Sequence, residues 1–191
     1  MVVAAQLHQL MPLAGPKVEL YVDPINKTFQ EFEVNTRLRV CAWLAEIAHE
    51  SNQLRCTHEM WGPTPIQLTY ERNFNHPWTS TDPINKKAFE LGNDAKGDGF
   101  KYRGHGLIEI TGKKNHDLAG KALGLNLVAT PELLEQPLYA CLSAGWFWQH
   151  HGLNELADHG YFPQITRIIN GGLTHEAERE AFYQHALKII Q

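Results

Sequence analysis

The chain of 191 residues lacks a disulfide framework, because its three cysteines, Cys41, Cys56 and Cys141, are odd in number and far apart. Cys41 and Cys141 lie in apolar runs with helical spacing, which predicts buried free thiols in a reducing compartment. No apolar run approaches the length of a membrane span, and the N-terminus lacks the basic region of a signal peptide. We therefore expect no export through a signal of its own and no stable membrane association.

An excess of positive charge is missing as well. Seventeen Lys and Arg residues stand against 21 Asp and Glu residues, which gives a net charge of -4 at pH 7. Nucleic acids and anionic surfaces attract basic proteins, so we expect no nucleic-acid partner. Repeats and low-complexity tracts are also absent, and a hydrophobic content of 43% is enough for one substantial core. The composition predicts one globular domain over residues 1–191.

Alternating strand patterns are scarce, whereas apolar residues recur with helical spacing along most of the chain. In RLRVCAWLAEIAHE, residues 37–50, the apolar residues occupy two faces, which is typical of a buried central helix. Residues 62–106 are interrupted by Pro and Gly and predict a long loop region with one short helix near residues 86–91. Loops of this length are often functional. The fold class predicted is mainly α.

Metal-binding motifs are absent. The chain contains two His-Glu pairs, His49-Glu50 and His58-Glu59, but neither has a second histidine four positions away, as a helical zinc-protease site requires. The eleven histidines are scattered without the spacing of a ligand set. We therefore predict no metal site and no cofactor.

Two glutamates near residue 50 are candidates for acid–base chemistry. Glu50 lies in line with Trp43 and Ile47 at the C-terminal end of the predicted central helix. Burial and the negative end of the helix dipole both favour a protonated carboxyl there, as a general acid requires. Glu59, beyond the helix, would be its ionised partner in a pair of the kind that hydrolyses glycosidic bonds. The alternative is that Glu50 simply turns into water, and spacing alone leaves both interpretations open.

Six separated segments resemble family 19 glycoside hydrolases, the chitinase-like enzymes that include bacteriophage endolysins. They are LAEIAHESNQLRCTHE, GDGFKYRGHGLIEITGKKNH, KALGLNL, AGWFWQHHGLNELAD, ITRIINGG and REAFYQHAL, and they occur in the order and approximate spacing of that family. The N-terminal LMPLAG resembles the phage and prophage members. The resemblance implies a lysozyme-like, largely helical, two-lobed fold with a central cleft. It also implies one catalytic domain over residues 1–191 without a separate wall-binding module.

The resemblance assigns roles to individual positions. Glu50 matches the general acid, Glu59 the base that activates water, with Glu71 as a weaker candidate, and Thr111 a residue that helps to hold that water. Substrate-binding or supporting positions are matched by Asn115, Asn170 and Arg179, while Arg103 is either structural or substrate-facing. Without the resemblance, Thr111, Asn115 and Asn170 would be interpreted as a helix cap, a surface polar group and a helix C-terminal turn.

Glu109 departs from the family, which commonly has Gln there. A carboxylate cannot donate a hydrogen bond to a sugar unless it is protonated. An ionised Glu109 beside Glu50 would add a like charge, and we expect Glu109→Gln to stay active with its basic limb at lower pH. The alternative is that Glu109 points away from the cleft into an ion pair with Arg103.

The resemblance implies an endolysin that cuts the β-1,4-linked glycan strands of peptidoglycan with inversion. Such an enzyme would stay in the host cytoplasm until a holin gives it access to the periplasm and cell wall, and we expect it to act as a monomer. Two alternatives stay open. The chain could be a chitinase acting on N-acetylglucosamine polymers, or an inactive wall-binding module that keeps the cleft without catalysis.

Overall fold

The computed structural model describes residues 1–191, and nearly all of its regular structure is helical. The helices are α1 (Ala4–Leu10), α2 (Lys17–Glu31), α3 (Arg37–Glu50), α4 (Pro65–Leu68), α5 (Lys86–Leu91), α6 (Asp98–Lys101), α7 (Lys113–Leu123), α8 (Pro137–His150), α9 (Leu153–Asp158), α10 (Phe162–Asn170) and α11 (Glu176–Ile189), with 3-10 turns η1 (Pro12–Ala14) and η2 (Pro131–Glu135). Strand pairing is limited to two isolated bridges, His58 with His105 and His105 with Ile110. The mainly α fold predicted from the sequence is confirmed, and none of the helices has the length and apolar content needed to cross a bilayer.

Helix α3 is the central helix that the sequence predicted. Thr36 caps its N-terminus by accepting a hydrogen bond from the backbone N–H of Arg39 (3.3 Å). Every residue from Val40 to Ala48 is buried, so the helix has no solvent-facing stripe. The helix ends at Glu50, which is partly exposed and follows directly after the buried residues of α3.

Helix α11 packs along α3. Its buried side chains are Arg179, Tyr183 and Ala186, whereas Phe182 is only partly covered. The buried face therefore includes an arginine, because Arg179 meets two carboxylates of α3 rather than apolar side chains.

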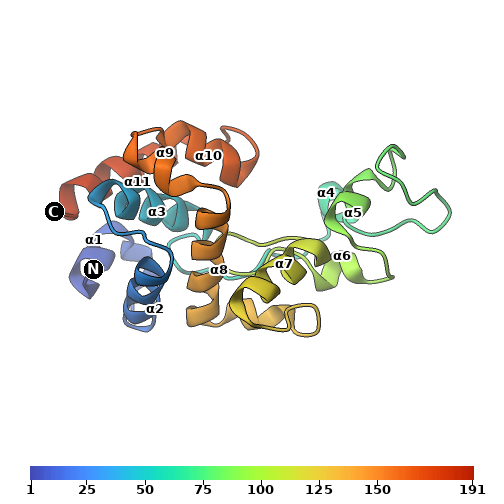
Figure 1. Cartoon of the computed structure of the whole chain (residues 1–191), viewed down its shortest axis with the longest axis horizontal. Coiled ribbons are helices and arrows are strands. Elements are labelled where there is room, and N and C mark those ends of the chain that lie inside the picture. The colour runs from blue at the N-terminus through green and yellow to red at the C-terminus, as the bar shows by residue number, and fades with distance from the viewer.

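The molecule has two lobes. In Figure 1, α1, α2, α3, α9, α10 and α11 lie at one end with both termini, α4, α5 and α6 lie at the other, and α7 and α8 lie between them. The main core surrounds α3, while a smaller apolar cluster of Ile110, Ala119, Leu127 and Leu134 supports the second lobe. The two-lobed, lysozyme-like arrangement expected from the sequence is confirmed.

Candidate active site

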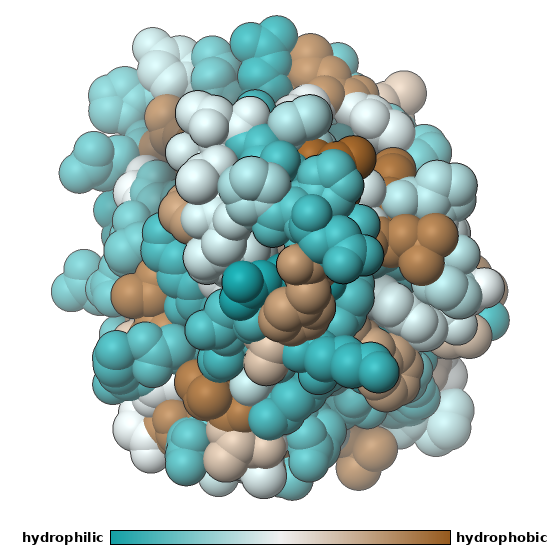
Figure 2. All heavy atoms as spheres, turned by 90° about the vertical axis from the view of Figure 1, so that its right-hand side faces the viewer, coloured by the Kyte–Doolittle hydropathy of each residue, from teal (hydrophilic) through white to brown (hydrophobic).

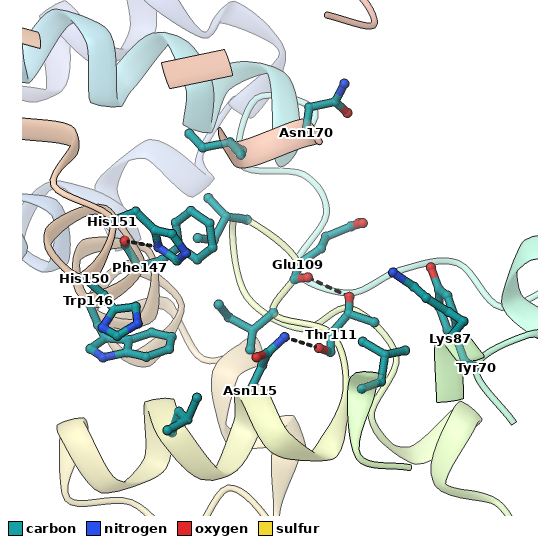
Figure 3. Close-up of a pocket in the computed structure, with 15 residues that line it drawn as sticks. Tyr70, Lys87, Glu109, Thr111, Asn115, Trp146, Phe147, His150, His151 and Asn170 are labelled. Carbon is teal, nitrogen blue, oxygen red and sulfur yellow. Dashed lines mark hydrogen bonds between the residues drawn. The ribbon is translucent and has the colours of Figure 1, made fainter. Parts of the chain in front are cut away.

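A cleft of about 420 Å³ lies at the junction of the lobes. Figure 3 shows Glu109, Thr111 and Asn115 on one side of this cleft, with Trp146 on α8 and Asn170 on α10 across from them and the side-chain amide of Asn170 directed away from Glu109. The cleft therefore brings together four of the polar side chains singled out in the sequence. Glu50, Glu59, Arg103 and Arg179 do not line this cavity; Glu50 and Glu59 lie beside it, within electrostatic reach of Glu109.

Glu50 shares one arginine with a second buried carboxylate. Arg179 donates one hydrogen bond to Oε1 of Glu50 and another to Oε2 of Glu46, one turn earlier on α3. Thr166 on α10 donates its hydroxyl to the other oxygen of Glu46 (2.6 Å). Burial raises the pKa of Glu46, and the guanidinium of Arg179 opposes this rise. Arg179 thus bridges the carboxylates of Glu46 and Glu50; the pairing with Glu46 was not predicted from the sequence.

A strained turn separates the two candidate catalytic glutamates. Asn52, Gln53 and Leu54 all have left-handed backbone conformations, with φ of 49°, 58° and 63°. Each such non-glycine residue costs about 1–2 kcal/mol. Ser51 stabilises the turn, because its hydroxyl donates to the carbonyl of Ile47 (2.6 Å) and accepts from the N–H of Leu54 (2.7 Å). The turn lies between the end of α3 at Glu50 and the segment that carries Glu59.

Both carboxylate oxygens of Glu59 are held by hydrogen bonds. The side-chain amide of Gln67 donates to Oε1 (2.9 Å), and the backbone N–H of Gly104 donates to Oε2 (3.2 Å). The backbone N–H of Glu59 in turn donates to the carbonyl of Gly104 (2.8 Å). Gln67 is buried and also donates to the carbonyl of Met60 (2.8 Å). The only sequence signal for Gln67 is its place in the capping box of α4, where it follows Thr64 by three residues.

The carboxylate of Glu71 binds backbone groups at the start of α6. It accepts hydrogen bonds from the backbone N–H groups of Gly97 (2.5 Å) and Gly99 (2.9 Å). A side chain at Gly99 would lie 2.7 Å from a Glu71 oxygen, so the close approach needs glycine. This geometry gives Glu71 a structural contact and favours Glu59 as the base.

We expect Glu59→Gln to lower the hydrolytic rate by about 10²–10⁴-fold, because an amide cannot take a proton from water. Glu71→Gln should keep most of the activity, since its carboxylate is tied to the α6 turn. Steady-state rates on a soluble oligosaccharide, with circular dichroism to confirm folding, compare the two variants. A larger loss in Glu71→Gln would reassign the base.

Glu109 lies beside Glu59 because Gly104 has no side chain. A Cβ atom at Gly104 would lie 2.7 Å from Cβ of Glu109 and 3.2 Å from Cβ of Glu59. Glu109 itself adopts a left-handed conformation, with φ of 54°, a cost that is common at functional sites. Burial, followed by the charges of Glu59 and Glu50, raises the pKa of Glu109 to about 7. Three carboxyl groups therefore converge on one edge of the cleft.

Two expectations about Glu109 need correction. It does not pair with Arg103, because Arg103 faces Glu135 (3.8 Å) and lies over the ring of Phe100 (4.5 Å to its centroid). Nor is Glu109 fully ionised at neutral pH, since burial favours the proton, and in that form its carboxyl can donate a hydrogen bond as Gln does. The structural alternative for Arg103 is thereby favoured.

We expect Glu109→Gln to stay active and to keep its activity above pH 7, where wild-type Glu109 ionises and loses its donor. A permanently ionised Glu109 would instead give a variant whose basic limb of activity moves to lower pH.

The folded state binds the proton of Glu109 more tightly than the unfolded state does, so wild-type stability is lost as pH rises through about 7. The variant should therefore gain stability relative to wild type at pH 8 and not at pH 4. Urea unfolding and pH–rate profiles test this; coinciding profiles would exclude Glu109 from the site's electrostatics.

Thr111 and Asn115 form a chain of hydrogen bonds that leads from Glu109. The hydroxyl of Thr111 donates to the carbonyl of Glu109 (2.8 Å), and the side-chain amide of Asn115 donates to the carbonyl of Thr111 (2.8 Å) (Figure 3). The N-cap of α7 is Gly112, so Thr111 is not a helix cap. The Thr111 oxygen can still accept a hydrogen bond from water in the cleft.

A buried histidine pair supports this wall of the cleft. Nδ1 of His105 lies 3.2 Å from Nε2 of His116, and burial lowers the pKa of His105 to about 3 and of His116 to about 4. Both rings are therefore neutral at pH 7. The backbone of His105 exchanges two hydrogen bonds with Ile110 (3.1 and 2.8 Å), which closes the turn that carries Glu109. A second bridge, between His58 and His105, joins this turn to the segment that carries Glu59. Nothing in the sequence distinguishes these two histidines from the other nine.

No group of three or more His, Cys, Asp or Glu side chains in the structure could hold a metal ion. The side chains beside the cleft that the sequence singled out carry carboxyl, hydroxyl and amide groups. Two carboxyl groups beside a cleft between helical lobes are the arrangement that hydrolyses glycosidic bonds. The fold and the site thus define a glycoside hydrolase.

Comparisons with known proteins agree with that class. The family model for glycoside hydrolase family 19, chitinase class I, matches residues 86–161. A glycosyl hydrolase family 19 domain-containing protein of Haemophilus influenzae is 33% identical over 156 residues, covering 68% of this chain and 74% of that protein. An Arabidopsis thaliana endochitinase is 41% identical over 75 residues, but these cover 39% of this chain and 26% of that enzyme.

The solved structure of chitinase C from Streptomyces griseus superposes with a TM-score of 0.70 at 21% identity, covering 99% of this chain and 76% of that one. A class IV chitinase from Zea mays gives a TM-score of 0.68 at 20% identity, covering 99% of this chain and 92% of that one. The chain belongs to glycosyl hydrolase family 19, and it is a chitinase-like glycosidase.

Proposed function

We propose that the chain is an endolysin that hydrolyses the β-1,4-glycosidic bonds of bacterial peptidoglycan by an inverting mechanism. The convergence of Glu50, Glu59 and Glu109 supports it most directly, because the charges of the first two reach the carboxyl of the third. Protonated Glu50 gives its proton to the glycosidic oxygen. Ionised Glu59 takes a proton from a water molecule that the hydroxyl of Thr111 helps to hold. The oxygen of that water then attacks the opposite face of the anomeric carbon.

Lys87 favours peptidoglycan over chitin. It lies on α5 and lines the cleft, where Figure 3 shows its ammonium group directed toward Thr111. No acidic side chain pairs with it, in contrast to Lys113, which pairs with Asp94 (2.5 Å). Stem peptides on peptidoglycan carry carboxylates that could bind this ammonium group, whereas chitin has none. This complementarity agrees with the resemblance of the N-terminal segment to phage and prophage proteins.

The alternative substrate is chitin, because the structural neighbours and the plant relatives are named as chitinases. An inactive wall-binding module is disfavoured, since both candidate carboxylates are present beside an open cleft. As an endolysin the chain would act as a monomer, remain in the host cytoplasm, and depend on a holin for access to the wall.

The test is hydrolysis of two polymers by the wild-type chain. Turbidity of outer-membrane-permeabilised Gram-negative cells should fall, and mass analysis of fragments from purified sacculi should show cleaved glycosidic bonds. Colloidal chitin should release little soluble oligosaccharide under the same conditions. Release from chitin without release from sacculi would establish the chitinase instead.

A further inference from the structure

The segment that follows Glu59 exposes an unusual share of apolar surface. Seven of the 14 exposed large hydrophobic residues lie between residues 60 and 101, which make up less than a quarter of the chain. They are Met60, Ile66, Leu68, Phe74, Ile84, Phe89 and Phe100. Scattered single apolar side chains are normal on a surface, so only a cluster of them within this segment would indicate an interaction surface.

Four side chains at the end of this lobe form a cluster, here named the aromatic tip: Arg72, Phe74, Trp78 and Phe89. The guanidinium of Arg72 lies 4.6 Å from the ring centroid of Phe74 and 4.8 Å from that of Trp78. The edge of Trp78 meets Phe89, with centroids 5.2 Å apart. Phe74 is 57% exposed. The loop that carries Phe74 and Trp78 reaches farthest from the two termini in Figure 1.

The tip is held rigidly by one buried asparagine. The side-chain amide of Asn85 donates to the carbonyls of Asn73 (2.9 Å), His76 (3.2 Å) and Pro77 (3.1 Å). Its side-chain oxygen accepts from the backbone N–H of Asn73 (2.8 Å). Arg72 is fixed at its other side by the carbonyl of Asp94 (3.0 Å). A preformed surface of this kind loses little entropy when it binds a ligand.

Charge and polarity at this end of the molecule disfavour an anionic lipid surface and favour a hydroxyl-rich ligand. Residues 60–101 contain five acidic and five basic residues, so the segment offers no net charge to an anionic lipid surface. Hydroxyl and amide side chains surround the aromatic ones, in the sequence NFNHPWTST at residues 73–81. Figure 2 looks onto this end and shows hydrophobic side chains separated by hydrophilic ones rather than one continuous apolar face. Aromatic faces for sugar rings, with hydrogen-bonding groups between them, suit a glycan.

The same segment reaches the catalytic cleft. Tyr70, two residues before Arg72, lines the cleft, as does Lys87, two residues before Phe89. A polymer that extends beyond the cleft along this lobe therefore meets the tip. We propose that the aromatic tip is a second, non-catalytic glycan-binding surface that holds the substrate polymer outside the cleft. The nature of that polymer, the glycan strand of peptidoglycan, rests on the proposed function.

The test measures binding without hydrolysis. In the Glu50→Gln chain, the double substitution Phe74→Ala/Trp78→Ala should weaken cosedimentation with purified sacculi by about tenfold, because two aromatic contacts are removed. Phe74→Ala alone, which changes an exposed side chain, should weaken it less and leave the loop intact. The matched control is Tyr161→Ala, an aromatic residue 48% exposed on the other lobe, which should bind as before.

Hydrolysis gives a second readout. With Glu50 intact, the tip variants should cleave a soluble short oligosaccharide at the wild-type rate and sacculi more slowly. Equal binding of all variants to sacculi and to chitin would overturn the proposal, as would binding of the tip to lipid vesicles in place of glycans. Weaker binding to chitin alone would keep a glycan surface but contradict peptidoglycan as the polymer. Lysis by the wild-type chain tests the proposed function independently of these results.

Discussion

Glu50→Gln should abolish lysis while the chain stays folded. The amide keeps the volume of the carboxyl and can still accept a hydrogen bond from Arg179, but it has no proton of suitable acidity for the glycosidic oxygen. We expect a loss of at least about 10²–10⁴-fold in the rate constant for hydrolysis. Single-turnover hydrolysis of a defined glycan, with thermal unfolding of both proteins, measures the loss.

The matched control is Glu180→Gln, because Glu180 is a partly buried neighbour of Arg179 on α11 whose carboxylate accepts a hydrogen bond from Gln184 (2.8 Å). It should keep wild-type rates. A folded Glu50→Gln chain with substantial activity would remove Glu50 from the mechanism, and the acid would then be sought in Glu109, whose pKa is raised to about 7.

Of the substitutions considered, Arg179→Met should lower the free energy of unfolding most. The substitution leaves the fully buried Glu46 and the nearly buried Glu50 without their shared counter-charge. Removal of one partner from a buried ion pair costs about 3–5 kcal/mol of unfolding free energy. Because burial raises the pKa of Glu46, its folded form takes up a proton more readily than its unfolded form. The loss of unfolding free energy should therefore be smaller at pH values below the folded pKa of Glu46, because protonation neutralises the carboxylate that Arg179 otherwise balances.

Urea unfolding at pH 5 and at pH 8 measures the loss of unfolding free energy at each pH. Arg39→Met is the control, since Arg39 pairs with Asp158, a third of whose side chain is exposed, and such pairs are worth about 1 kcal/mol or less. Equal losses for the two arginine variants, or a loss independent of pH, would mean that Arg179 serves packing alone. Activity should also fall in Arg179→Met, because the guanidinium fixes the position of the Glu50 carboxyl.

Local pattern was enough to predict the central elements of the fold. The two apolar faces of residues 37–50 determined a buried helix that ends at Glu50, and the bounds of α3 agree with that prediction. Within residues 62–106 the sequence predicted α5 but not α4 or α6, each of which is only four residues long. Helical periodicity depends on neighbours three and four residues apart, so a single segment contains all the information that this inference needs.

The sequence by itself determined the fold class, the central helix, the absence of a metal motif and, through resemblance, the family. Only the tertiary structure decided which charges meet. It paired Arg179 with Glu46 as well as Glu50, engaged Glu71 at the α6 turn, and raised the pKa of Glu109 to about 7. The physical reason is that burial and charge at one residue depend on groups that lie far away in the chain, 129 positions in the case of Glu50 and Arg179.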